Sequence, residues 1–116
     1  MRRQVRDNGI VIASTGLTHQ AQLNDEIKTA VGKLNRYEVA NVSFSLGNDS
    51  TNTPALFFRI ILQDQASGED RLGDVTGRVA TTLFDSIRPF ENWGLTPYFS
   101  FRSVSEQMLR RDPEWA

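Results

Sequence analysis

Residues 55–64 constrain the fold of this chain more than any other segment. They read Ala-Leu-Phe-Phe-Arg-Ile-Ile-Leu-Gln-Asp, and this density of branched and aromatic side chains is typical of a β-strand. Residues 39–46 alternate apolar and polar side chains, which is the pattern of a half-buried strand. The polar cluster at 47–54 consists of residues that favour turns. The sequence therefore predicts an antiparallel hairpin over 39–64.

Two further segments carry apolar residues at helical spacing. The first covers roughly 18–36, with Thr18 as its expected N-cap, and the second covers roughly 69–88 and ends or kinks at Pro89. The buried stripe of the first helix is expected to contain Leu23, Ile27, Ala30, Val31 and Leu34. The stripe of the second is expected to contain Leu72, Val75, Val79, Leu83 and Ile87. Both helices are therefore expected to pack on the predicted sheet.

The remaining elements leave two versions of one α+β fold open. Residues 97–102 predict a last strand, and the capping-box spacing of Ser103 and Glu106 predicts a short helix over 104–111. Residues 9–14 are apolar and β-branched enough for a short first strand. With that strand, the order is the ferredoxin-like split βαβ arrangement, βαββαβ plus a short C-terminal helix. Without it, the sheet has three strands with helices on one face. Both versions are two-layer sandwiches.

The chain has the length of a single domain, because 116 residues leave no room for two. Residues 1–8 are polar and are expected to be a flexible N-terminal segment, so the predicted domain covers 9–116. The longest apolar runs are far too short to cross a membrane.

Composition argues against several kinds of chemistry. The chain has no cysteine, which excludes disulfides and cysteine-ligated zinc, and its one histidine, His19, excludes paired-histidine metal sites. Asp64 has no partner at a spacing that suggests catalysis, so no catalytic residue, metal or cofactor is predicted. The net charge of −1 provides no field that would attract nucleic acid or anionic lipid. A binding function is therefore favoured over an enzymatic one.

One face of the predicted sheet is expected to lack helices, and alternation along the strands identifies the residues on it. Leu56, Phe58, Ile60 and Leu62 form the unbroken apolar side and are expected to face the helices, as are Phe99 and Phe101. The opposite face is then expected to carry the candidate binding residues Phe57, Arg59, Ile61, Tyr98 and Arg102, on a background of Asn41, Ser43 and Ser45.

Three interpretations of this face are open. Aromatic rings beside arginines are enriched in protein interfaces, which favours self-association or binding of another protein. The same mixture can stack the bases of single-stranded nucleic acid, but the chain lacks the positive charge that such binding usually needs. In the third interpretation, C-terminal residues such as Met108, Leu109 and Trp115 fold over part of the face. Protein binding is the favoured function, and single-stranded nucleic-acid binding is the alternative.

The 69–88 helix carries two further patterns. Gly73 and Gly77 lie four residues apart, which favours close packing of another backbone, with a dimer contact as the alternative. Arg71, Asp74 and Arg78 have ion-pair spacing on one side, which is typical of a solvated face.

A resemblance is carried by Pro54-Ala-Leu-Phe-Phe-Arg together with Pro97-Tyr-Phe-Ser-Phe-Arg-Ser-Val-Ser-Glu106. This stretch resembles a group of short bacterial α+β proteins that share an apolar strand, an arginine-bearing helix and a last strand with Phe-Arg before a Ser/Glu turn. The resemblance covers about half of the chain and excludes residues 1–36. The group has no settled function, so the resemblance implies a bacterial, cytoplasmic protein and assigns no catalytic residue.

Overall fold

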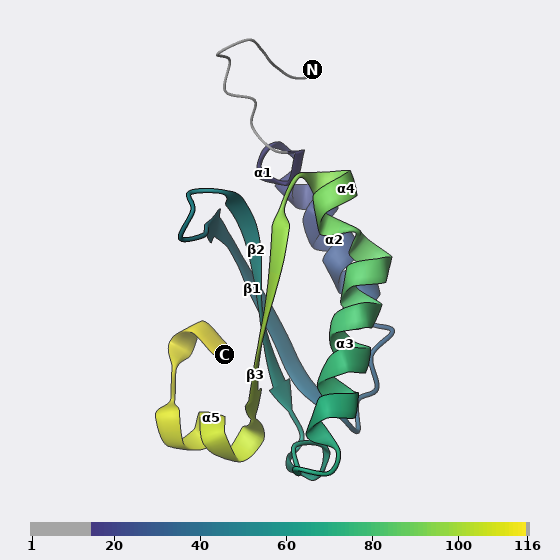
Figure 1. Ribbon diagram of the computed structural model, residues 1–116, viewed down its shortest axis with the longest axis vertical. Coiled ribbons are helices and arrows are strands. Elements are labelled where there is room, and N and C mark those ends of the chain that lie inside the picture. The colour runs from purple at the N-terminus through teal and green to yellow at the C-terminus, as the bar shows by residue number, and fades with distance from the viewer. Residues whose placement is uncertain (1–14, 116) are drawn as a thin grey trace.

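A computed structural model describes residues 15–115, which fold into an α+β structure around an open, mixed sheet of three strands (Figure 1). The strands are β1 (Val39–Asn48), β2 (Pro54–Leu62) and β3 (Thr96–Ser103). The helices are α1 (Thr15–Thr18), α2 (Gln20–Val31), α3 (Leu72–Ile87), α4 (Pro89–Trp93) and α5 (Val104–Arg110), with 3₁₀ turns η1 (Asp64–Ala66) and η2 (Pro113–Trp115). The predicted strand 9–14 and the predicted segment 1–8 lie outside the described residues. Among residues 15–115, no helix is both long and apolar enough to span a membrane.

The sheet confirms the predicted hairpin and does not confirm the ferredoxin-like layout. β1 and β2 pair antiparallel, with Ser43 opposite Arg59 and Leu46 opposite Leu56. β3 then pairs directly and in parallel with β2, after the crossover through α3. A split βαβ arrangement keeps a further strand between the two strands that such a crossover joins. Here those two strands are neighbours in the sheet order β1-β2-β3.

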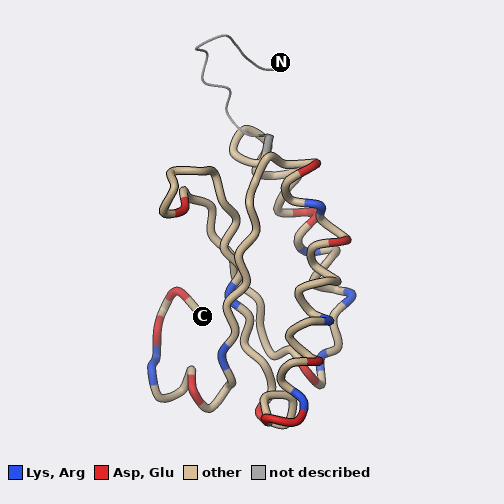
Figure 2. The backbone as a smooth tube through the Cα atoms, viewed as in Figure 1, with Lys and Arg blue, Asp and Glu red and all other residues tan. Residues whose placement is uncertain are grey.

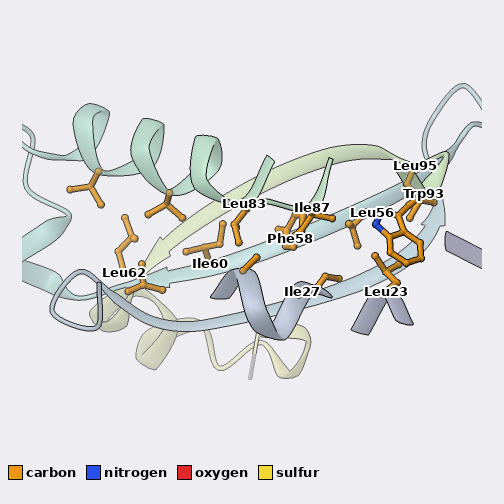
Figure 3. Packing of buried hydrophobic residues seen from close by; sticks show 14 of the residues in the cluster. Leu23, Ile27, Leu56, Phe58, Ile60, Leu62, Leu83, Ile87, Trp93 and Leu95 are labelled. Carbon is orange, nitrogen blue, oxygen red and sulfur yellow. The ribbon is translucent and has the colours of Figure 1, made fainter. Parts of the chain in front are cut away.

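The core lies between the sheet and the helices α2 and α3, which cover the same face (Figures 1 and 3). The four alternate β2 residues predicted to face the helices, Leu56, Phe58, Ile60 and Leu62, are at most 1% exposed. The α3 stripe is buried as predicted at Val75, Val79, Leu83 and Ile87. Leu72 does not belong to it, because it is the first residue of α3 and is 39% exposed. Phe99 and Phe101 pack against the core but are only partly buried.

The first helix is shorter than predicted at both ends. α2 begins after His19, with no side-chain cap from Thr18, and ends at Val31. Gly32 is the C-cap of α2, and the chain then turns because the Asn35 carbonyl accepts from the amides of Glu38 and Val39. The helical spacing of apolar residues continues through these turns to about residue 36, so it does not indicate where the helix ends.

The side of α3 that was predicted to be solvated is tied to the rest of the fold. Arg78 donates from Nη1 and Nη2 to the two carboxylate oxygens of Glu38, at 2.8 and 2.9 Å, and Arg71 donates to Glu38 at 3.2 Å. Glu38 is 7% exposed and directly precedes β1. The hydrogen bonds from Arg78, aided by the charges of both arginines, lower the Glu38 pKa against the opposing effect of burial. This interaction joins the start of α3 to the sheet.

The interpretation of Gly73 and Gly77 as a site of close packing is wrong for the described residues. A methyl group added at either position would meet no heavy atom of another element within 4 Å. The glycine that does allow close packing is Gly16, because a methyl group there would overlap the side chain of Leu95, which is fully buried.

Candidate functional site

The candidate binding residues lie on the sheet face opposite α2 and α3, in three rows that cross the strands. The register places Ser45, Phe57 and Tyr98 in the first row, Ser43, Arg59 and Ser100 in the second, and Asn41, Ile61 and Arg102 in the third. The alternation of the strand sequences therefore identified the members of this face correctly. How much of it is accessible depends on the chain that follows β3.

The C-terminal segment covers the part of the third row that contains Arg102, while Asn41 remains exposed. In Figure 1, α5 and η2 lie on the side of the sheet away from α2 and α3. The ring of Trp115 is 8% exposed and lies over the Arg102 guanidinium, with 4.1 Å from Cζ to the ring centroid. Arg102 also donates to Gln107 at 2.8 Å and to Asp112 at 3.3 Å, which leaves its side chain 10% exposed. Ile61 is 6% exposed.

Polar residues of β1 hold the end of this segment. Asn41 Nδ2 donates to the Trp115 carbonyl at 3.3 Å, and Ser43 Oγ donates to the Glu114 carbonyl at 3.2 Å. Met108 and Leu109 do not take part in the cover, since they are 69% and 87% exposed. The prediction that the C-terminus folds over part of the face is therefore confirmed for Trp115 and wrong for the other two residues.

The start of α5 is fixed by two caps. Ser103 Oγ accepts from the Glu106 amide at 3.0 Å, which confirms the predicted capping. Asp64, just after β2, accepts from the Ser105 amide at 3.0 Å and from the Ser105 hydroxyl. These bonds lower the Asp64 pKa. Asp64 therefore has a structural explanation in which it orients α5 across the sheet.

The first row remains uncovered and contains a fixed aromatic pair. The rings of Phe57 and Tyr98 stack with their centroids 5.4 Å apart and an interplanar angle of 16°. The Tyr98 hydroxyl donates to Asp49 Oδ2 at 2.7 Å, and Tyr98 remains 41% exposed. Asp49 accepts further bonds from the amides of Thr51 and Thr53, at 2.9 and 3.0 Å. The β1–β2 loop thus holds the Tyr98 ring in place.

These bonds change the acid–base properties of both partners. Hydrogen bonds from the Thr51 hydroxyl, from Tyr98 and from the backbone hold the Asp49 pKa far below its ordinary value. The same bond to Asp49 raises the pKa of Tyr98. Asp49 is therefore an ionised anchor at neutral pH, and Tyr98 keeps its proton.

Arg59 lies between the covered and the uncovered rows. Its Nη2 donates to Ser45 at 2.9 Å, and its side chain is partly exposed. Among the described residues, no carboxylate forms an ion pair with Arg59, in contrast to Arg102. In the second row, Ser100 is exposed beside it. Phe57, Tyr98, Arg59 and Ser100 together form the area that we call the open corner.

The residues that could have suggested catalysis do not come together. In residues 15–115 no three His, Asp or Glu side chains are close enough to hold a metal ion. His19 Nδ1 lies 2.9 Å from the Thr18 hydroxyl at the start of α2, and Asp25 and Glu26 are exposed on that helix. None of them lies on the sheet face that carries the open corner.

Comparison of the chain with protein-family models, with curated proteins and with solved structures finds no match. The resemblance to short bacterial α+β proteins therefore stays a prediction.

Proposed function

We propose that the protein acts by binding another protein through the open corner. The observation that carries this proposal is the fixed and solvent-accessible Phe57–Tyr98 pair, which the C-terminal segment leaves uncovered. Aromatic side chains and arginine contribute most to the energy of protein interfaces, particularly where the rings are held rigidly before binding. The cytoplasmic location implied by the resemblance belongs to the same proposal.

The chemistry of the corner indicates what the partner offers. Arg59 has N–H donors but no carboxylate partner among residues 15–115, so an acidic side chain of the partner would complete it. The exposed ring of Tyr98 offers an apolar surface next to that charge. We therefore expect the partner to present an apolar or aromatic side chain beside an Asp or Glu.

Single-stranded nucleic acid fits the corner less well. Phe57 and Tyr98 stack on each other, so one face of each ring is already occupied and is not free for a base. The Tyr98 hydroxyl is bound to an ionised carboxylate, which repels phosphate. Arg59 is one cation, and phosphate contacts usually need several.

The proposal is tested by affinity capture with a matched pair of charge reversals. Arg59→Glu changes the open corner, whereas Arg36→Glu makes the same change at an exposed site before β1. Wild-type, Arg59→Glu and Arg36→Glu proteins are immobilised, exposed to lysate of the native cells, and compared by quantitative mass spectrometry.

We expect a partner that is retained by wild type and Arg36→Glu and is lost from Arg59→Glu. If all three baits retain the same proteins in equal amounts, the open corner is not the binding surface. Arg102→Glu is unsuitable for this test, because it would break the contacts with Trp115 and Asp112 and disturb the fold.

A further inference from the structure

The outer edge of β3 has no strand beside it in the described part of the chain. β3 is the last strand in the sheet order, and its eight residues form backbone pairs with β2 on one side. Its sequence is uncharged from Thr96 to Phe101, and its one proline, Pro97, is the second residue of the strand and not in its middle. Figure 2 shows how few charged residues the strands carry. A long uncharged edge is a template for pairing with another strand, unless a charge or a proline in its middle blocks it.

The sequence of β3 is complementary to itself when it is read in both directions from Ser100. If two copies pair antiparallel with Ser100 opposite Ser100, Phe99 of each strand lies opposite Phe101 of the other. Tyr98 then lies opposite Arg102, whose guanidinium is already held within its own chain by Trp115, Gln107 and Asp112. The cross-strand aromatic pairs are the favourable contacts of this register. No like charges meet in this register.

The side of α3 that faces this edge is also uncharged. Gly73 and Thr76 of α3 and Phe101 of β3 line a groove of about 510 Å³, which Arg102 and Glu106 also line from the other side. Further along the same side of the helix lie Ala80 and Phe84, and Phe84 is 38% exposed. Arg71 and Arg78 point the other way, toward Glu38. The helix therefore has one charged side that is used within the fold and one uncharged side that is not.

Gly73 and Gly77 lie on or next to this uncharged side, with open space where a side chain would be. Their presence lowers the stability of an isolated helix, since glycine is among the least favourable residues in a helix interior. No other element of the described chain packs against these two glycines, so packing within the chain does not explain them. A second helix could approach closely at these positions.

We propose that two copies of this chain associate through the β3 edge and the adjoining side of α3. The strands pair antiparallel about Ser100 and continue the sheet to six strands, and the two α3 helices pack at their glycines. The eight residues of β3 make a contact about 26 Å long, and this contact includes both the strand edge and the adjoining side of α3. Both copies together therefore bury on the order of 1,000 Å². That area is at the lower limit for a specific interface, and the helix contact is needed to reach it.

This inference does not rest on the proposed function, although the dimer contact and the open corner share Tyr98 and Ser100 of β3. Arg59 lies on β2 and belongs to the open corner alone, so capture with Arg59→Glu tests the proposed function separately from the dimer. Two open corners would lie on the same side of the joined sheet.

The test places a charge at the centre of the contact. Ser100→Lys brings two ammonium groups together at the two-fold axis, while in one chain the exposed position tolerates lysine. Ser50→Lys makes the same change in the β1–β2 loop and is the control. Light scattering is expected to give twice the 13.1 kDa of one chain for wild type and Ser50→Lys. Ser100→Lys is expected to weaken the dimer at least about tenfold.

The register is tested with cysteines, because the natural chain has none. Under mild oxidation, Ser100→Cys is expected to form a covalent dimer, and Ser50→Cys is not. Gly77→Leu is expected to weaken the dimer without lowering the melting temperature of the monomer, since leucine favours the helix more than glycine does. A wild-type monomer at all concentrations would overturn the proposal, as would a dimer that Ser100→Lys leaves unchanged. A third pair of results would also overturn the proposal. If Ser100→Cys forms no cross-link, and if deleting residues 9–14 from the wild-type chain abolishes the dimer, the interface belongs to those residues and not to the β3 edge.

Discussion

Replacement of Trp115 by alanine tests whether the C-terminal segment is a packed part of the fold. The Trp115 side chain is 8% exposed, so its loss removes up to about 200 Å² of burial, which corresponds to about 5 kcal/mol at most. Residual burial in the unfolded chain lowers this figure by up to about 40%. The contact with Arg102 adds roughly 1 kcal/mol.

A gain in chain entropy offsets part of this loss of stability, because each residue of η2 recovers about 1 kcal/mol of backbone freedom when the segment detaches from the sheet. The net cost of Trp115→Ala is therefore about 1–3 kcal/mol. For a domain of this size that corresponds to a fall in melting temperature of up to about 10 °C.

The assay is thermal unfolding followed by circular dichroism, with Leu109→Ala as the matched control. Leu109 is 87% exposed in the same segment, so its replacement is expected to change the unfolding free energy by less than about 0.5 kcal/mol. Trypsin cleavage at Arg110 and Arg111 is expected to become faster in Trp115→Ala, because the segment is released from the sheet. A Trp115→Ala variant that melts within about 2 °C of wild type would refute the reasoning that the segment covers part of the third row.

Three further predictions concern the rest of the fold. Gly16→Ala is expected to lower the unfolding free energy by about 1–3 kcal/mol, because the added methyl group would overlap the buried side chain of Leu95. Gly32→Ala is the control and is expected to raise the unfolding free energy by about 0.5 kcal/mol, because Gly32 has an ordinary helical φ of −62°. Denaturant titration measures both changes. Glu38→Gln is expected to cost about 2 kcal/mol at pH 7 through weaker bonds to its arginines. Because folding lowers the Glu38 pKa, this carboxylate stabilises the protein fully above its unfolded value of about 4.5 and loses the effect as the pH falls through the lower folded value. The melting temperature of Glu38→Gln should therefore depend less on pH below about 4.5 than that of wild type, and equal slopes would contradict the ion pair. Asp64→Ala removes a cap of α5, so hydrogen exchange at the Ser105 amide should become faster, while an unchanged rate would show that Asp64 does not hold the helix.

The faces of the sheet could be predicted from the sequence because side-chain direction in a strand has a strict period of two. That period placed Phe57, Arg59 and Ile61 of β2 on one side, and the register confirms it. It does not determine which strands are neighbours. The direct parallel pairing of β2 with β3 depends on tertiary packing, so the two versions of the fold could not be separated by alternation.

The accessibility of the candidate residues could not be predicted in the same way. Arg102 and Ile61 lie on the predicted face but are buried, and Trp115, which folds back over Arg102, comes well after both of them in the chain. The turn at Asp49 could be predicted locally, because an aspartate in a polar loop often accepts a hydrogen bond from the amide two residues later, as Asp49 does from Thr51. Its bond to Tyr98 joins residues 49 apart in sequence, and no local pattern indicates it.

The most direct test of the open corner is photo-crosslinking in the native cells. A photoreactive phenylalanine derivative replaces Tyr98 in one variant and Tyr37 in the other, and Tyr37 is the control because it is an aromatic residue that is 81% exposed away from the corner. We expect a discrete adduct with a different protein, not with a second copy of this chain, from position 98 and none from position 37. Equal adducts from both positions, or adducts at position 98 that nuclease removes, would contradict protein binding through the open corner.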